Sequence, residues 1–76
     1  AIVEHEVKIG EDSHVGPGVK IGGRTTIGDN TFIGLGATII DNIKIGNCVK
    51  IGAGSVIIKD IDPNTTIVGI PGRPVR

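Results

Sequence analysis

Aliphatic residues recur at every sixth position along most of this chain. Starting at Val3 and stepping by six residues, every position as far as Ile57 is valine or isoleucine. The ten positions are Val3, Ile9, Val15, Ile21, Ile27, Ile33, Ile39, Ile45, Ile51 and Ile57. A fixed step that continues without a gap indicates a structural repeat of six residues.

Two further positions of each six-residue unit are also restricted. The residue two places before each aliphatic position, from Val7 to Ser55, is small or β-branched, and glycine follows seven of the ten aliphatic residues. Side chains two apart on a strand face the same way, so each unit directs one large and one small side chain inward. The glycine then begins a corner.

Three such sides close a coil of 18 residues, and successive coils pair as parallel strands about 4.8 Å apart. Frequent glycine and β-branched residues argue against helices. We therefore predict an all-β fold, a parallel β-helix of about three coils over residues 1–58. The tail, residues 59–76, carries three of the four prolines and is predicted to form a C-terminal loop and closing strand.

Composition limits the classes of function. The formal net charge is zero and Phe32 is the only aromatic residue, which argues against a nucleic-acid partner. The single cysteine, Cys48, excludes an internal disulfide and is interpreted as structural. No long apolar run indicates a membrane span and no leader pattern is present, so we expect a cytoplasmic protein. Because the repeat is already running at Val3, we also expect the chain to be part of a longer protein.

One corner of the predicted coil is unusually rich in glycine. In rows of 18 residues, its three levels are Gly16-Pro17-Gly18, Gly34-Leu35-Gly36 and Gly52-Ala53-Gly54. Glycine tolerates positive φ in a turn, and it also permits close approach to the backbone. The other two corners manage with one glycine or none at most levels. The pattern therefore favours a groove for a long thin ligand over turn chemistry alone, and leaves both explanations open.

The six-residue unit can be written [Ile/Val]-Gly-x-x-[small]-x, and it repeats without interruption. This pattern resembles that of the hexapeptide-repeat acyltransferases. This resemblance covers essentially the whole chain. It implies a left-handed coil and a homotrimer with active sites between subunits. It also implies acetyl-CoA as co-substrate, lying along the helix axis against the glycine-rich corner.

The segment IVEHEVKIGEDSHVGPG, which contains both histidines of the chain, is more specific. It is similar to bacterial nucleotide-sugar N-acetyltransferases related to sialic-acid O-acetyltransferases. The resemblance implies that His5 is the general base, that Glu6 tunes it, and that His14 contacts acetyl-CoA near the thioester. Further CoA contacts are implied at Leu35 and Ala53. The neighbouring glycines of the same corners, Gly36 and Gly54, are assigned to the cofactor as well.

The implied reaction is the direct transfer of an acetyl group to an amine or hydroxyl of a sugar or nucleotide sugar. Histidine can remove the acceptor's proton near neutral pH, and a hydrogen-bonded carboxylate fixes its tautomer. The thioester is already activated, so no nucleophilic side chain and no metal are needed. For His5 itself, the plain alternative is an exposed histidine in a charged turn.

Three rival functions remain at this stage. The tail GIPGRPVR also resembles that of serine acetyltransferases, although the Glu-His-Glu context disfavours this group. A zinc carbonic anhydrase on the same fold would need three histidine ligands, and the chain has two. The third rival is a non-catalytic trimerising scaffold.

The sequence leaves the ends of the site open. Lys59, Arg73 and Arg76 are candidates for CoA phosphates, although the preferred interpretation of each is a solvated tail charge. Related enzymes carry an N-terminal α/β domain, of which this chain contains no trace. The acceptor, and the choice between N- and O-acetylation, stay undetermined.

Overall fold

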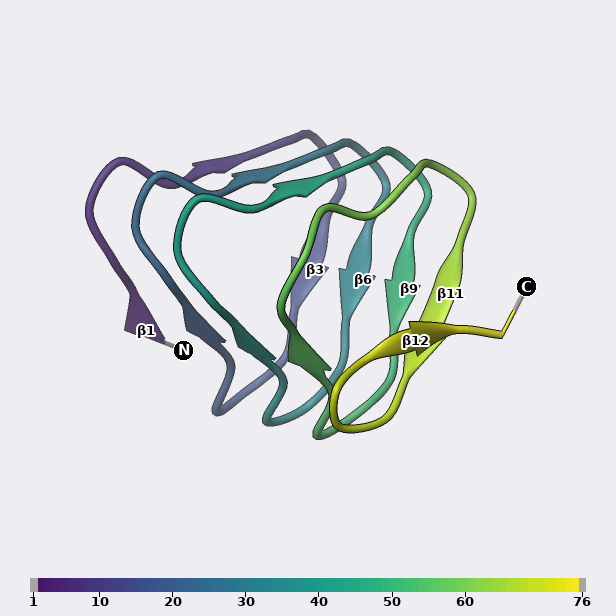
Figure 1. Ribbon diagram of the computed structural model, residues 1–76. Helices are drawn as coiled ribbons and strands as arrows, with labels where there is room; N and C mark the ends of the chain where they lie inside the picture. The colour runs from purple at the N-terminus through teal and green to yellow at the C-terminus, as the bar shows by residue number, and fades with distance from the viewer. Residues whose placement is uncertain (1, 76) are drawn as a thin grey trace.

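The computed structural model describes residues 2–75 as a stack of three-sided coils (Figure 1), and every regular element is a short strand. The strands are β1 (Ile2–Val3), β2 (Lys8–Ile9), β3 (His14–Val15), β4 (Lys20–Ile21), β5 (Thr26–Ile27), β6 (Phe32–Ile33), β7 (Thr38–Ile39), β8 (Lys44–Ile45), β9 (Lys50–Ile51), β10 (Val56–Ile57), β11 (Thr66–Val68) and β12 (Arg73–Pro74). The all-β prediction is confirmed.

Each side of the coil is a sheet of parallel strands, to which β12 is added antiparallel at the end of one sheet. The sheets have the orders β1-β4-β7-β10, β2-β5-β8 and β12-β11-β9-β6-β3. In the first of them Ile2 pairs with Lys20, and Lys20 pairs with Thr38. Each residue therefore pairs with the residue 18 positions later, in the next coil. The predicted coil length is therefore correct.

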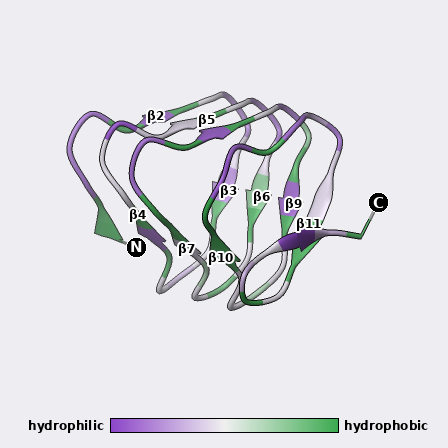
Figure 2. Ribbon diagram, in the orientation of Figure 1, coloured by the Kyte–Doolittle hydropathy of each residue, from purple (hydrophilic) through white to green (hydrophobic). Residues whose placement is uncertain are grey.

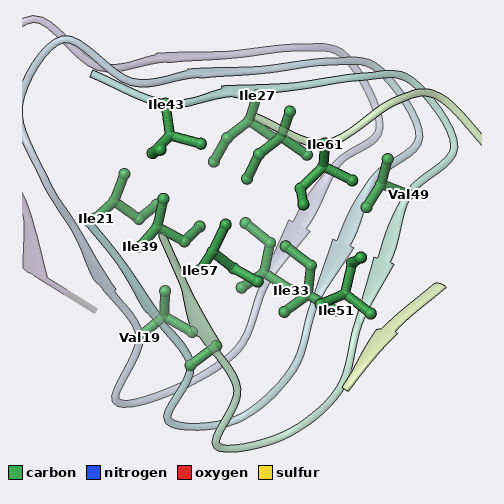
Figure 3. Close-up of a cluster of buried hydrophobic side chains, with 13 residues drawn as sticks. Val19, Ile21, Ile27, Ile33, Ile39, Ile43, Val49, Ile51, Ile57 and Ile61 are labelled. Carbon is green, nitrogen blue, oxygen red and sulfur yellow. The ribbon is translucent and has the colours of Figure 1, made fainter. Parts of the chain in front are cut away.

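The aliphatic residues of the six-residue repeat fill the interior (Figure 3). Ile21, Ile33 and Ile51 are almost completely buried. The outward residue of the same strand is polar in many cases, so hydrophilic and hydrophobic residues alternate along the chain (Figure 2). This alternation is the period-two pattern of a strand with one buried face.

Several of the small inward positions carry hydroxyl groups that find partners in the next coil, whereas the buried Ser55 hydroxyl has none among residues 2–75. The Ser13 hydroxyl donates to the Gly28 carbonyl at 2.6 Å, and the Thr31 hydroxyl donates to the Gly46 carbonyl at 2.9 Å. Each bond links a residue to the corner of the following coil. Buried hydroxyls are stabilised only when they are paired in this way.

The last coil is two residues shorter than the others. Ile61 pairs with Ile45, 16 positions earlier, and Ile67 pairs with Ile51 at the same spacing. Both residues are buried in the core, although the six-residue count does not find them. After Val68 the chain turns back, and β12 pairs antiparallel with β11 across the end of the stack (Figure 1).

Residues 2–75 contain no apolar helix of the length needed to span a membrane.

Candidate active site

All three corners use one backbone turn, and its last residue lies in the left-handed region. At the corner formed by residues 10–12, 28–30 and 46–48, the φ angles of Asp12, Asn30 and Cys48 are 58°, 53° and 57°. We call this the ladder corner. At the corner of residues 16–18, 34–36 and 52–54, the glycine corner, Gly36 and Gly54 have φ angles of 70° and 73°.

The third corner, formed by residues 4–6, 22–24 and 40–42, is called the histidine corner. Levels of each corner are joined by a backbone hydrogen bond from the last residue of one turn to the middle residue of the turn below. Arg24 N–H donates to the His5 carbonyl at 2.9 Å, and Gly36 N–H donates to the Pro17 carbonyl at 2.9 Å. The corners therefore stack in straight columns, as expected from an 18-residue coil.

The glycine corner presents a bare backbone wall. A Cβ built on Gly36 or Gly54 would meet no other atom of the described chain within 4 Å. The middle residues of these turns, Leu35 and Ala53, are exposed. The structure thus stacks the predicted CoA-contacting residues Leu35, Gly36, Ala53 and Gly54 in one column.

His5 lines a groove of about 620 Å³ beside the sheet of β1, β4 and β7. Its lining contains the polar side chains of Glu4, His5, Lys20, Thr38 and Asp41, the backbone of Gly22 and Gly23, and the apolar side chains of Ile2, Ile21, Ile39 and Ile40. Lys20 and Asp41 were not among the site residues predicted from the sequence. For Asp41 the signal was present, because writing the chain in rows of 18 places it in the same column as His5.

Glu6 is placed differently from its neighbour. It has a φ of 60° and lines a separate groove with Lys8 and Arg24, whereas Glu4 shares the larger groove with His5. In a single chain, the glutamate neighbour that shares the groove of His5 is therefore Glu4, and the more distant Asp41 lines the same groove. The predicted pairing of His5 with Glu6 stays a prediction.

His14 lies on another side of the coil, in β3. Its ring stacks on that of Phe32 with centroids 5.2 Å apart and an angle of 9° between the planes. His5, in contrast, lies between β1 and β2. The two histidines line no common groove of the described chain, so one chain does not by itself bring them together.

The remaining candidates lie away from both histidines. Lys59 and Arg73 are exposed near the C-terminal end, and Arg76 lies outside the described residues. Cys48 is a free, exposed thiol at the ladder corner. Within residues 2–75 no group of three or more histidine, cysteine, aspartate or glutamate side chains is arranged to hold a metal ion.

The comparison with protein families matches residues 24–59 to the model described as bacterial transferase hexapeptide (six repeats). The chain is a hexapeptide-repeat β-helix. This repeat is the one that builds left-handed coils, which confirms the predicted fold class in full. A search of the curated proteins found no match.

Solved structures of high similarity include two sugar-modifying enzymes. A mutant of perosamine N-acetyltransferase from Caulobacter crescentus, in complex with CoA and GDP-perosamine, has a TM-score of 0.92 and 28% identity, covering 93% of this chain and 34% of that one. The acetyltransferase domain of PglB from Neisseria gonorrhoeae, in complex with acetyl coenzyme A, has a TM-score of 0.82 and 32% identity, with 96% and 40% covered.

A serine acetyltransferase is equally similar. The enzyme from Neisseria gonorrhoeae, in complex with serine, has a TM-score of 0.88 and 34% identity, covering 99% of this chain and 37% of that one. The chain spans between about a third and about half of the length of these neighbours. Sugar and amino-acid acetyltransferases thus share this repeat portion.

Proposed function

We propose that this chain is the β-helix portion of an acetyl-CoA-dependent acyltransferase that acetylates an amine or hydroxyl of a sugar or nucleotide sugar in bacterial glycan biosynthesis. The observation that carries the proposal is the groove of His5, which places an imidazole beside carboxylates on a hexapeptide-repeat coil. Similar structures solved with CoA or acetyl-CoA support the co-substrate. A cytoplasmic location fits this role and stays a prediction.

In the proposed reaction His5 is the general base. Its ring takes a proton from the acceptor amine or hydroxyl while that atom attacks the carbonyl carbon of the acetyl thioester. The carbon–sulfur bond then breaks, and the proton passes from the imidazolium to the thiolate, which leaves as CoA-SH. A donor at the carbonyl oxygen, from His14 or a backbone N–H, stabilises the tetrahedral oxyanion.

We propose that His14 contributes to the active site of another copy of the chain in an oligomer. Because His5 and His14 lie on different sides of one chain, they can serve one reaction only if a second copy brings its His14 to the groove of His5. A homotrimer with active sites between subunits would satisfy this requirement. Glu6, which lines a different groove, would then orient His5 only if the side chains rearrange when the assembly forms.

CoA itself is proposed to lie along the glycine corner. Its pantetheine arm is long and thin and carries two amides, which can pair with backbone N–H and C=O groups. The open space beside Gly36 and Gly54 supports this placement. Leu35 and Ala53 would contribute mainly their backbone, since neither side chain is held in the core.

The acceptor is proposed to be a nucleotide sugar. Lys20 is the lysine that lines this groove beside the carboxylates of Glu4 and Asp41, and the proposal assigns its ammonium group to a phosphate oxygen of the nucleotide. The second candidate acceptor is serine, which the 34% identity to a serine acetyltransferase favours. A non-catalytic scaffold is the outcome if acetyl-CoA does not bind at all.

The test is His5→Ala with acetyl-CoA and three acceptors: GDP-perosamine, dTDP-4-amino-4,6-dideoxyglucose and L-serine. Loss of a general base typically lowers kcat by about 10²–10⁴-fold. The matched control is Glu11→Ala, which changes the same turn position one corner later. Thiol release measures turnover, while circular dichroism and sedimentation check the fold and the assembly. Full activity in His5→Ala contradicts the assignment of the base.

A further inference from the structure

Asp41 is a carboxylate in the groove of His5 to which the proposed mechanism gives no role. It is exposed, and it lies at the histidine corner two coils after His5. At the intermediate level of the corner, Gly22 and Gly23 also line the groove, whereas Arg24 lines the separate groove of Glu6. The groove therefore runs from an imidazole, over two glycines, to a carboxylate.

The two glycines keep this path open. A Cβ built on Gly22 would lie 2.7 Å from Asp41 Oδ1 and 2.5 Å from Asp41 N. A Cβ built on Gly23 would lie 3.2 Å from the His5 carbonyl oxygen. The Asp41 carboxylate thus lies next to Gly22, on the side that faces the preceding coil, and neither Gly22 nor Gly23 places a side chain between it and His5.

At the ladder corner, the side chain at the middle position of the turn holds its coil to the preceding one. Asp29 Oδ1 accepts a hydrogen bond from Glu11 N–H at 2.8 Å, and Asn47 Oδ1 accepts one from Asp29 N–H at 2.7 Å. Asp41 occupies the same turn position at its own corner. Within residues 2–75 its carboxylate accepts no such bond, so both oxygens keep their capacity to accept hydrogen bonds from a ligand.

The spacing matches one sugar ring. Two coils separate the corners of His5 and Asp41 by roughly 10 Å at the usual strand spacing. This is about the span of a six-membered ring with a hydrogen bond at each end. A ligand whose reacting amine faces His5 would therefore present its ring hydroxyls to Asp41.

Building on the proposed function, we propose that Asp41 binds a ring hydroxyl of the acceptor sugar and thereby selects the acceptor. An ionised carboxylate accepts hydrogen bonds from hydroxyls strongly, and a site that is built to pair a hydroxyl rejects an analogue without it. Asp41 takes no part in proton transfer in this account. It sets the affinity and orientation of the sugar while His5 acts on the amine.

The test is the acceptor KM of Asp41→Ala and Asp41→Asn with dTDP-4-amino-4,6-dideoxyglucose and saturating acetyl-CoA. Loss of a hydrogen bond to a charged group predicts a KM raised roughly tenfold or more in Asp41→Ala, with a smaller change in kcat. Asp41→Asn keeps an oxygen that accepts hydrogen bonds, so its acceptor KM should lie between those of the parent chain and Asp41→Ala. The matched control, Asp29→Ala, removes a structural carboxylate and should leave the acceptor KM unchanged.

The outcomes separate this inference from the proposed function. An unchanged KM in Asp41→Ala, with an active parent chain, overturns the role of Asp41 and leaves the acetyltransferase assignment standing. If the parent chain turns over no acceptor, the same nucleotide sugar is titrated by NMR. Shifts at the amides of Gly22, Gly23 and Asp41 support the inference, and their absence overturns it. Failure to bind acetyl-CoA in calorimetry overturns the proposed function instead.

Discussion

The glycine corner and the ladder corner have the same backbone and different surfaces. Both turns end in a residue of positive φ, and the angle is 53° at Asn30 and 70° at Gly36. The ladder corner is covered by side chains that bond the coil below, such as that of Asn47. The glycine corner has no side chain at its final position, and the space beside Gly36 and Gly54 is open.

The difference separates two reasons for glycine. Asparagine, aspartate and even Cys48 make this turn at the ladder corner, so the conformation alone does not require glycine. Asparagine is among the residues that tolerate the left-handed region best. What glycine adds at the glycine corner is access to the backbone, which is the property that a pantetheine arm would use.

The largest expected effect concerns the first glycine of the turn, which both corners need for close approach of the coils. A Cβ on Gly28 or Gly34 would lie 2.7 Å from a backbone nitrogen of the next coil. Gly28→Ala and Gly34→Ala should each lower the free energy of unfolding by about 3 kcal/mol, as severe overpacking does. Urea titration followed by circular dichroism measures this.

Gly23→Ala is the control for this pair, since its Cβ would approach nothing closer than 3.2 Å. Gly23→Ala should lower the free energy of unfolding distinctly less than the other two substitutions. Equal unfolding midpoints for Gly23→Ala and Gly34→Ala would contradict the close-approach explanation.

A smaller effect is expected from the ladder side chains. Asn47→Ala removes the acceptor of the Asp29 N–H bond and should cost about 1 kcal/mol, the usual net value of one hydrogen bond. Asp41→Ala changes the same turn position where no such bond exists, so its unfolding midpoint should match that of the parent chain. The idea of a structural ladder fails if the two variants are equally stable.

The regular part of the fold could be predicted because its rule is local. One large and one small inward residue per unit, repeated at six, determine the strands and the 18-residue register. Ile61 and Ile67 escaped this rule because the last coil is two residues shorter, so the count of six loses them. The two residues that the last coil lacks shift the numbering of the later core positions, while the inward-facing aliphatic side chains continue to stack.

The site was less predictable for a physical reason. The columns correctly grouped the glycine-corner residues, because stacking follows from the coil length alone. They could not tell whether Glu4 or Glu6 shares a groove with His5, since both glutamates are adjacent to His5 in the sequence and only the structure shows that they line different grooves. Resemblance assigned His5 and His14 to one reaction, whereas the structure places them on different sides of one chain, and residue spacing does not reveal what a second copy contributes.

Acetyl-CoA binding to Gly54→Asn is the sharpest test of whether the glycine corner holds CoA. Asparagine can adopt the positive φ of 73° found here, and its Cβ has room, so the free energy of unfolding should change by less than about 1 kcal/mol. The added side chain would occupy the space proposed for pantetheine. We predict that calorimetry finds saturable acetyl-CoA binding to the parent chain and a strong loss in Gly54→Asn, while Asn30→Gly at the ladder corner binds normally. Equal affinity of Gly54→Asn and the parent chain would contradict the claim.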